Sequence, residues 1–186
     1  MKGALIGTHH TGKTTALAFL TYNLPFRSQV GIGNEVAIDC PYPLNEGGGF
    51  LTQWWILVHQ IERESKLAKW YPNFITDRGV IDSIVYARVL ADKGKMTENE
   101  FQQIARTATA WMELFPYDFL IYLSPLDECP IGGSRDYMME LDRQFHLTIA
   151  SLNGHGMNLQ VYPVVHQDKQ QRNESILKAV KEAMRL

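Results

Sequence analysis

One stretch of eight residues near the N-terminus constrains the fold more than any other part of the chain. Residues 7–14 read GTHHTGKT and follow the apolar run Ala4-Leu5-Ile6, so the pattern G-x-x-x-x-G-K-[ST] stands between a predicted strand and a predicted helix. In this context the backbone N–H groups of the loop form a concave site for phosphate oxygens, and the helix adds the positive end of its dipole. The stretch therefore predicts a site for a nucleoside triphosphate.

The residues of this loop are expected to divide between shape and binding. Gly7 and Gly12 allow the tight turn, Lys13 is expected to reach the β- and γ-phosphates, and the Thr14 hydroxyl is expected to bind a bridging Mg²⁺ ion. The two histidines are expected to contribute loop backbone, because no Cys or carboxylate stands beside them at metal-ligand spacing. The predicted nucleotide site comprises Gly7, Thr8, His9, His10, Thr11, Gly12, Lys13, Thr14 and Thr15.

Length and composition set wider limits. With 186 residues, 45% of them hydrophobic, the chain can form a single domain over residues 1–186 with a sizeable core. The 18 Lys and Arg nearly balance the 20 Asp and Glu, so the net charge indicates neither a nucleic-acid nor a membrane surface. Cys40 and Cys129 lack the spacing of a metal site or a disulfide framework and are expected to be reduced. With no apolar leader and no apolar run near about 18 residues, we expect a cytoplasmic chain without a membrane partner.

Short apolar runs alternate with helical patterns along the chain, which indicates an α/β fold with helices covering a parallel sheet. After the first strand, further strands are expected at residues 29–33, 74–77, 119–123 and 160–165. Helices are expected from Lys13 to Asn23 and over residues 50–70, 80–90, 97–115, 135–152 and 173–184, with a capping box at Thr97 and Glu100 and a capping glycine at Gly154.

Two segments carry a more specific expectation. The period of three or four between apolar residues in 50–70 predicts a long amphipathic helix. The polar segment after the fourth strand is expected to form a lid at about residues 124–145, in which Arg135 and Arg143 would close over the transferring phosphoryl group. The alternative for either arginine is an ordinary surface residue. The apolar residues that set the helical period are Leu51, Trp54, Trp55, Val58 and Ile61.

Polar residues at the ends of two other predicted strands complete the candidate site. Asp77 ends an apolar strand, where a carboxylate can hold Mg²⁺, and Arg78 beside it can clamp phosphate with its planar guanidinium. The alternative for Asp77 is a helix cap before Val80. Glu35 follows the second strand, and a solvated loop glutamate is an equally open interpretation of it.

These clusters make the chain similar to a known family. The loop GTHHTGKTT, the NEVA segment at 34–37, the TDRG segment at 76–79 with Asp82 and Tyr86 after it, and the late arginine-bearing segment resemble the nucleoside-kinase-like P-loop family that includes the nicotinamide riboside kinase domain. Deoxyribonucleoside and thymidylate kinases are more distant relatives. The resemblance spans nearly the whole chain and implies a five-stranded parallel sheet in the order 2-3-1-4-5, with helices on both faces.

The resemblance also implies roles for single residues. In the deoxynucleoside branch the glutamate after the second strand accepts the proton of the acceptor hydroxyl, and the acidic-Arg pair after the third strand serves Mg²⁺ and phosphate. Glu35 and the pair Asp77-Arg78 stand at those positions. A glutamine early in the following helix reads the nucleobase, and Gln53 stands at a similar point, where an exposed glutamine is an equally open interpretation. Residues 38–39 carry no Arg where the family often has one, so the identity of the acceptor does not carry over.

We therefore expect a Mg²⁺-dependent kinase that moves the γ-phosphoryl group of ATP to a hydroxyl of a nucleoside- or nucleotide-like acceptor. GTPases normally carry an N-K-x-D motif, which is not present, and motors and helicases usually need longer chains. Two alternatives stay open: a kinase of a hydroxymethylated base, such as 5-hydroxymethyluracil, in phage DNA, and a nucleotide-binding ATPase that regulates a protein partner. The near-neutral charge weighs against the first. The choice of ATP or GTP and the oligomeric state are also open.

Overall fold

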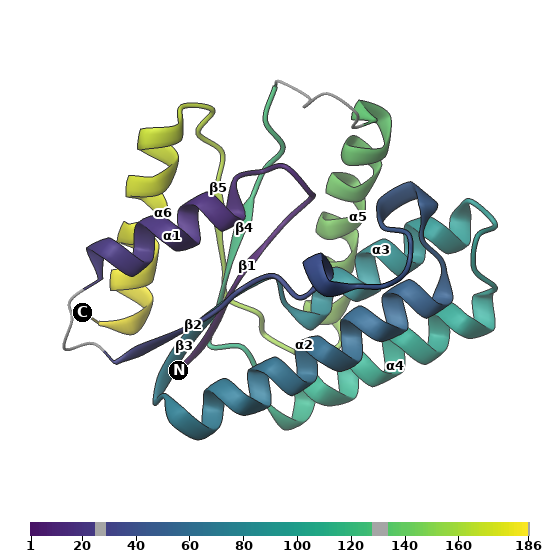
Figure 1. The fold of residues 1–186 in the computed structure, drawn as a ribbon, viewed down its shortest axis with the longest axis horizontal. Coiled ribbons are helices and arrows are strands. Elements are labelled where there is room, and N and C mark those ends of the chain that lie inside the picture. Colours follow the sequence, from purple (N-terminus) through teal and green to yellow (C-terminus); the bar gives the residue numbers. More distant parts are fainter. Residues whose placement is uncertain (25–28, 128–133, 186) are drawn as a thin grey trace.

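Five parallel strands form the centre of the structure, a computed structural model that describes residues 1–24, 29–127 and 134–185. Their order is β2-β3-β1-β4-β5, as expected, and Figure 1 shows helices on both faces of the sheet. The strands are β1 Lys2–Ile6, β2 Val30–Gly33, β3 Asn73–Asp77, β4 Phe119–Leu123 and β5 Val161–Val164. The helices are α1 Lys13–Asn23, α2 Phe50–Trp70, α3 Val80–Asp92, α4 Glu98–Leu114, α5 Arg135–Gly154 and α6 Lys169–Met184, with short 3₁₀ helices at Ala37–Asp39 and Asn45–Gly47.

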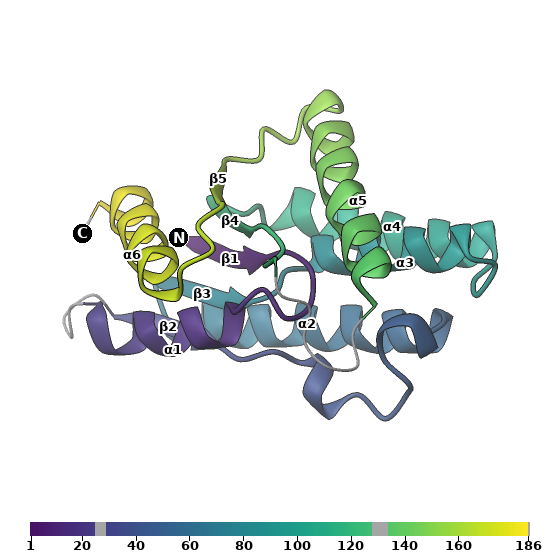
Figure 2. The ribbon, with the colours of Figure 1, turned by 90° about the horizontal axis from the view of Figure 1, so that it is seen from above.

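The central strand β1 separates two hydrophobic cores. Its side chains alternate, so Ala4 and Ile6 pack with buried residues of α2, α3, α4 and α5, whereas Leu5 packs with those of α1 and α6. Figure 2 shows the sheet between these two groups of helices. All three side chains are fully buried, and burying one leucine contributes about 2 kcal/mol. The two covered faces leave the carboxyl-end edge of the sheet to carry the polar loops.

Two helix boundaries differ from the predicted ones. The last helix, α6, begins at Lys169 rather than near residue 173, because the Asp168 side chain caps it by accepting the Gln171 N–H at 2.9 Å. Gly154 was expected to cap α5, but the helix continues through it, and the left-handed glycine is Gly156, with φ 90°. Local hydrogen bonds thus determine where α6 begins and where α5 ends.

Helix α2 has the expected bounds, yet much of its apolar face points outward. Leu51, Trp54 and Val58, which set its period, are 58%, 37% and 41% exposed. Polar side chains are tolerated on the inner face because they find partners there, such as the ion pair between Glu64 and Lys2. The buried polar residues of α2 are Thr52, Gln53, Gln60 and Glu64.

In the described part of the chain, no helix combines the length and the apolar character that crossing a membrane requires. Cys40 is a free thiol, and Cys129 lies outside the described residues. Residues 128–133 of the expected lid also lie outside the described residues. The described part of this lid consists of residues 124–127 after β4 and the first turns of α5.

Candidate active site

The loop between β1 and α1 has the backbone shape that its glycines predict. Gly7 has φ 134°, and a Cβ there would stand 2.5 Å from the Leu123 carbonyl oxygen, so only glycine fits. Gly12 has φ 85° and directly precedes α1. No side chain among the described residues caps this helix, so the N–H groups of its first turn remain free to bind an anion.

Lys13 lies inside the loop and is 5% exposed. Its Nζ donates to the carbonyl oxygens of Gly7 at 3.1 Å and Thr8 at 2.5 Å and to Thr11 Oγ1 at 3.1 Å. Burial, together with the nearby charge of Arg78, lowers the pKa of Lys13 to about 7. A phosphate group in the loop would raise this pKa again, because it stabilises the charged ammonium.

Thr14 and Asp77 meet at the base of the loop. Thr14 Oγ1 donates to Asp77 Oδ2 at 2.7 Å, and the other carboxylate oxygen, Asp77 Oδ1, is buried with no hydrogen-bond partner among the described residues. Burial raises the pKa of Asp77 in spite of the nearby Lys13. A buried carboxylate oxygen without a partner, beside a hydroxyl, is a donor set that fits Mg²⁺.

Arg78 joins the carboxylates of two different elements. Its Nε forms an ion pair with Glu35, and its Nη1 lies 3.2 Å from Asp82 Oδ1 of α3. Burial would raise the pKa of Glu35, but the ion pair with Arg78 lowers it overall, so Glu35 is ionised at neutral pH. Asp82 is fully buried, and its pKa rises to about 6 although Arg78 opposes the rise.

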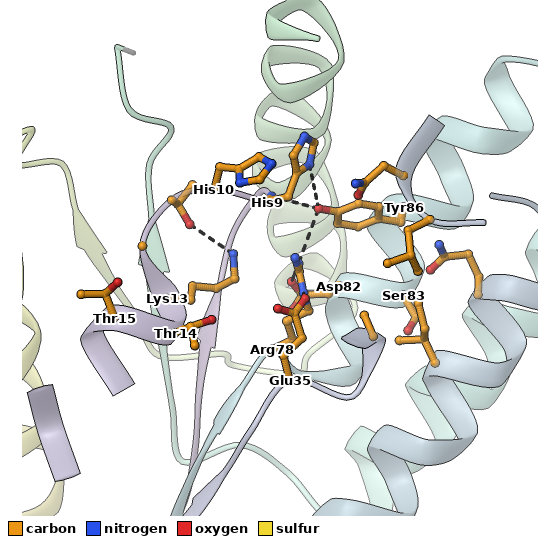
Figure 3. Close-up of a pocket in the computed structure, with 17 residues that line it drawn as sticks. His9, His10, Lys13, Thr14, Thr15, Glu35, Arg78, Asp82, Ser83 and Tyr86 are labelled. Carbon is orange, nitrogen blue, oxygen red and sulfur yellow. Dashed lines mark hydrogen bonds and ion pairs between the residues drawn. The ribbon is translucent and has the colours of Figure 1, made fainter. Parts of the chain in front are cut away.

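His9 presents a ring to the site, although only its backbone was expected to contribute. Tyr86 Oη accepts the His9 backbone N–H at 3.0 Å and a longer, 3.5 Å hydrogen bond from Arg78 Nη1. The phenol proton is then directed to His9 Nδ1, 3.3 Å away, which leaves the imidazole proton on Nε2. Burial and the charges of His10 and Arg78 lower the pKa of His9 to about 4, so the ring is neutral at pH 7. Figure 3 shows His9 and Tyr86 side by side above Arg78.

Most of these groups line one cavity of about 450 Å³, whereas Gly7 and Asp77 lie outside its lining. Its phosphate end is the loop from His9 to Thr15, and its other end lies between α2, α3 and the segment after β2. Gln53 lines this second end and is 3% exposed, so it is not the exposed helix glutamine of the alternative interpretation. Ser83 Oγ, also in the lining, is buried without a partner among the described residues. The remaining lining residues of the second end are Glu35, Ala37, Leu44, Asn45, Ile56, Arg78, Asp82 and Tyr86.

The two arginines of the expected lid do not line this cavity in the described structure. Arg135 is the first residue of α5, is exposed, and donates to the Asp127 carbonyl oxygen. Arg143 lies two turns further along the same helix and is also exposed. The opposite side of α5 packs on α3 through residues such as Leu141. Their role at the phosphoryl group stays a prediction.

Sequence reasoning missed Arg172 of α6, which holds the phosphate loop from behind. The guanidinium is 3% exposed and donates to the carbonyl oxygens of Thr11 at 2.8 Å, His166 at 2.8 Å and Ser124 at 2.9 Å. No carboxylate of the described residues pairs with it, and burial lowers its pKa. Thr11 and Arg172 lie 161 positions apart, so no local pattern could have joined them.

Solved structures share this fold across the whole chain. NadR in complex with NR superposes with a TM-score of 0.77 at 16% identity, and the match covers 100% of this chain and 51% of NadR. The chain thus spans about half the length of NadR. Deoxyadenosine kinase from M. mycoides, with products dCMP and a flexible dCDP bound, gives a TM-score of 0.71 at 18% identity, and the match covers 98% of this chain and 100% of the kinase.

Comparisons of sequence alone give a sharper result. No curated protein matches the chain. The family model described as deoxynucleoside kinase matches residues 5–185, which include both the phosphate loop and the Glu35, Asp77 and Arg78 cluster. The expected resemblance to nucleoside kinases is therefore confirmed. The branch that matches is that of the deoxynucleoside kinases, which had been expected to be more distant relatives. The chain belongs to the deoxynucleoside kinase family.

Proposed function

We propose that this protein transfers the γ-phosphoryl group of ATP to a hydroxyl of a nucleoside-like acceptor, with Mg²⁺ as cofactor. The observation that carries the proposal is that the phosphate loop and the Glu35–Arg78 ion pair line the same cavity. A phosphoryl donor held at one end and an acceptor at the other would meet beside this ion pair. Membership of the deoxynucleoside kinase family supports the same reaction.

The chain's own groups would act mostly by position and charge. Lys13 and Arg78 neutralise the charge on the phosphoryl oxygens, and the N–H groups at the start of α1 bind the other phosphates. Thr14 and Asp77 would hold Mg²⁺ through their oxygen atoms, and the cation would offset negative charge between the β- and γ-phosphates. These interactions strengthen as charge moves toward the leaving oxygen.

Glu35 is the proposed base. It is ionised, 18% of its side chain is exposed, and it lines the cavity beside Arg78, so it can take the proton of the acceptor hydroxyl. Asp77 accepts a hydrogen bond from the Thr14 hydroxyl at the base of the loop, and a bound cation would hold the pKa of Asp77 low. The two carboxylates therefore have different proposed tasks.

The second end of the cavity supports an uncharged acceptor. Gln53 offers an amide and Ser83 a hydroxyl without a partner in the described part of the chain, between the apolar side chains of Leu44 and Ile56, which suits a flat ring with a polar edge. The Lys and Arg side chains in the described lining are Lys13 and Arg78, and Arg78 is already paired with two carboxylates. A nucleotide would bring phosphate charge with no further Lys or Arg among the described lining residues to meet it, so we propose a nucleoside. No observation favours the DNA kinase or the regulatory ATPase.

The test incubates the protein with γ-labelled ATP, Mg²⁺ and a panel of acceptors. Because the similar structures are those of a deoxyadenosine kinase with dCMP and of NadR with NR, the panel holds deoxyadenosine, deoxycytidine and nicotinamide riboside beside nucleotides and hydroxymethylated DNA. Label on a nucleoside supports the proposal, and label only on a nucleotide or on DNA contradicts it.

Two variants separate the carboxylates. Glu35→Gln should bind Mg²⁺-ATP normally but lose about 10²- to 10⁴-fold in kcat, the range typical of a general base. Asp77→Asn should instead raise the Mg²⁺ concentration needed for half-maximal rate, because one of its two proposed ligand oxygens is lost. If the two phenotypes are exchanged, Asp77 is the base.

A further inference from the structure

A second polar cluster lies beneath the turn that follows β3, outside the cavity lining. Its centre is Glu64 of α2, which is 0% exposed and forms an ion pair with Lys2 Nζ at 2.8 Å. Lys2 is itself 1% exposed and also donates to the Phe115 carbonyl oxygen at 2.8 Å. The Glu64 carboxylate accepts three further hydrogen bonds, from Gln60 Nε2 at 3.0 Å, Trp111 Nε1 at 2.6 Å and Tyr117 Oη at 2.6 Å.

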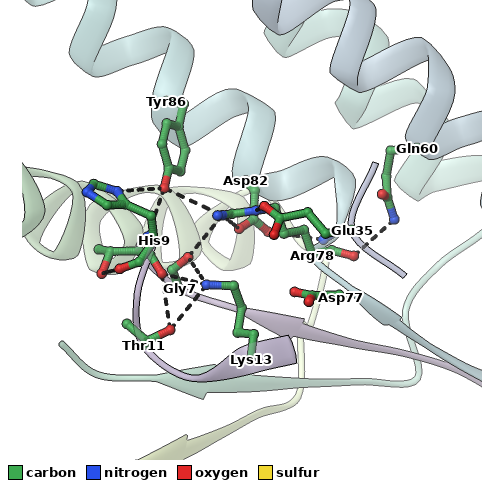
Figure 4. A network of polar contacts seen from close by, with 12 residues as sticks. Gly7, His9, Thr11, Lys13, Glu35, Gln60, Asp77, Arg78, Asp82 and Tyr86 are labelled. Atoms are coloured by element: carbon green, nitrogen blue, oxygen red, sulfur yellow. Dashed lines mark hydrogen bonds and ion pairs between the residues drawn. The ribbon is translucent and has the colours of Figure 1, made fainter. Parts of the chain in front are cut away.

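Two members of this cluster also bind the backbone of the turn. Gln60 Nε2 donates to the Arg78 carbonyl oxygen at 2.9 Å, as Figure 4 shows. Tyr117 Oη, whose proton goes to Glu64, accepts the Val80 N–H at 2.8 Å. Gln60 and Tyr117 thus connect the Arg78 carbonyl oxygen and the Val80 N–H, on the two sides of Gly79, to the buried Glu64 carboxylate.

The turn needs such support because Arg78 has φ 73°. A residue with a Cβ rarely adopts this left-handed conformation unless its surroundings hold it there. Gly79 contributes space, since a Cβ on it would stand 2.7 Å from Tyr117 Oη. The conformation aims the Arg78 side chain at Glu35 and Asp82, and the Asp77 carboxylate before it at Thr14.

We propose that Glu64 is a positioning residue for the proposed phosphoryl transfer, acting through Gln60 and Tyr117 on the turn that carries Asp77 and Arg78. Apolar side chains of similar size would often stabilise a core as well as a buried ion pair does. They would, however, offer no donor to the Arg78 carbonyl oxygen and no acceptor to the Val80 N–H. The inference rests on the proposed function for its kinetic consequence, but its structural part does not.

The kinetic experiment uses two variants that change few atoms. Gln60→Met keeps the length of the side chain and removes its two hydrogen bonds, and Tyr117→Phe removes a single oxygen. Each should lower kcat by about 10- to 100-fold and change the KM for ATP less than about threefold, because a displacement of about 1 Å at reacting groups can cost about 100-fold. The control is Ile176→Val, which removes one buried methylene on the α6 side of the sheet and should leave kcat unchanged.

Melting temperatures show that each variant is folded at the temperature of the assay. Folded Gln60→Met and Tyr117→Phe proteins with the kcat of Ile176→Val would overturn the proposal, because the cluster would then be structural only. If Gln60→Met does not fold, Tyr117→Phe alone decides.

Hydrogen exchange separates this inference from the proposed function. In both variants the amides of residues 78–80 should exchange faster than in the wild type, whereas those of α1 should not change. This readout remains decisive even if the wild type phosphorylates no acceptor on the panel, a result that would remove the proposed function alone. Unchanged exchange at residues 78–80 would overturn the positioning role.

Discussion

Replacing His9 by Asn should remove a large acid-dependent loss of stability. The imidazole is 8% exposed, and burial with the charges of His10 and Arg78 lowers its pKa from 6.5 to about 4. The unfolded chain therefore binds a proton at a pH at which the folded protein does not. The stabilising effect of the neutral ring is present above pH 6.5 and is lost as the pH falls from there toward 4.

The size of the effect follows from the two pKa values. The difference between a pKa of 6.5 and one of about 4 corresponds to about 3 kcal/mol below pH 4. About 2 kcal/mol of this should be lost between pH 7 and pH 5. Because the ring is nearly covered, solvent screening reduces the figure little. An Asn side chain can still accept the Tyr86 hydroxyl proton but does not titrate.

Urea unfolding at pH 7 and pH 5 measures the difference in the wild type, in His9→Asn and in the control His10→Asn, which removes an exposed imidazole from the same loop. Asp82, whose pKa rises to about 6, changes stability in the opposite direction, but it is present in all three proteins and cancels. The wild type should lose about 2 kcal/mol more than His9→Asn, and His10→Asn should lie between the two, because it removes one of the charges that lower the pKa of His9. An equal loss in His9→Asn and the wild type would refute both the burial argument and the neutral ring at the phosphate loop.

Two further predictions concern cations. Lys13→Ala should lower kcat by about 10²- to 10³-fold, because it removes the charge that we propose faces the transferred group, while circular dichroism should show an intact fold; a near wild-type rate would place the chemistry elsewhere. Arg135→Ala and Arg143→Ala should each reduce kcat more than ATP affinity if α5 moves toward the cavity during the reaction, and equal losses in rate and affinity would indicate binding in the ground state only.

Local patterns predicted those features of the chain that depend on neighbouring residues. The glycines of the phosphate loop were found from their spacing, and their positive φ angles follow from the turn itself. The capping box was found the same way: Thr97 Oγ1 accepts the Glu100 N–H at 3.3 Å, and Glu100 Oε2 accepts the Thr97 N–H at 2.7 Å. The strand order came from the family resemblance instead, because strand spacing alone does not order a parallel sheet.

Features that depend on distant partners could not be predicted in this way. The period of α2 identified a helix but not its inner face, because Glu64 is buried through a partner, Lys2, 62 positions away. The His9 ring lies in the cavity because Tyr86 receives its N–H, and a pattern that leaves this loop position free says nothing of the ring. Gln53 was singled out only by resemblance; it lines the cavity, and its role toward an acceptor stays a prediction.

The three carbonyl partners of Arg172 have a practical consequence. Carbonyl dipoles accept three of the five guanidinium N–H groups but bring no net negative charge, so among the described residues no carboxylate neutralises this cation directly behind the phosphate loop. Multivalent anions that settle in the loop should therefore protect the fold: sulfate or phosphate buffer should raise the melting temperature above that in chloride at equal ionic strength. The same ions would compete with ATP, so a buffer chosen to keep the protein soluble through purification would inhibit it in the assay.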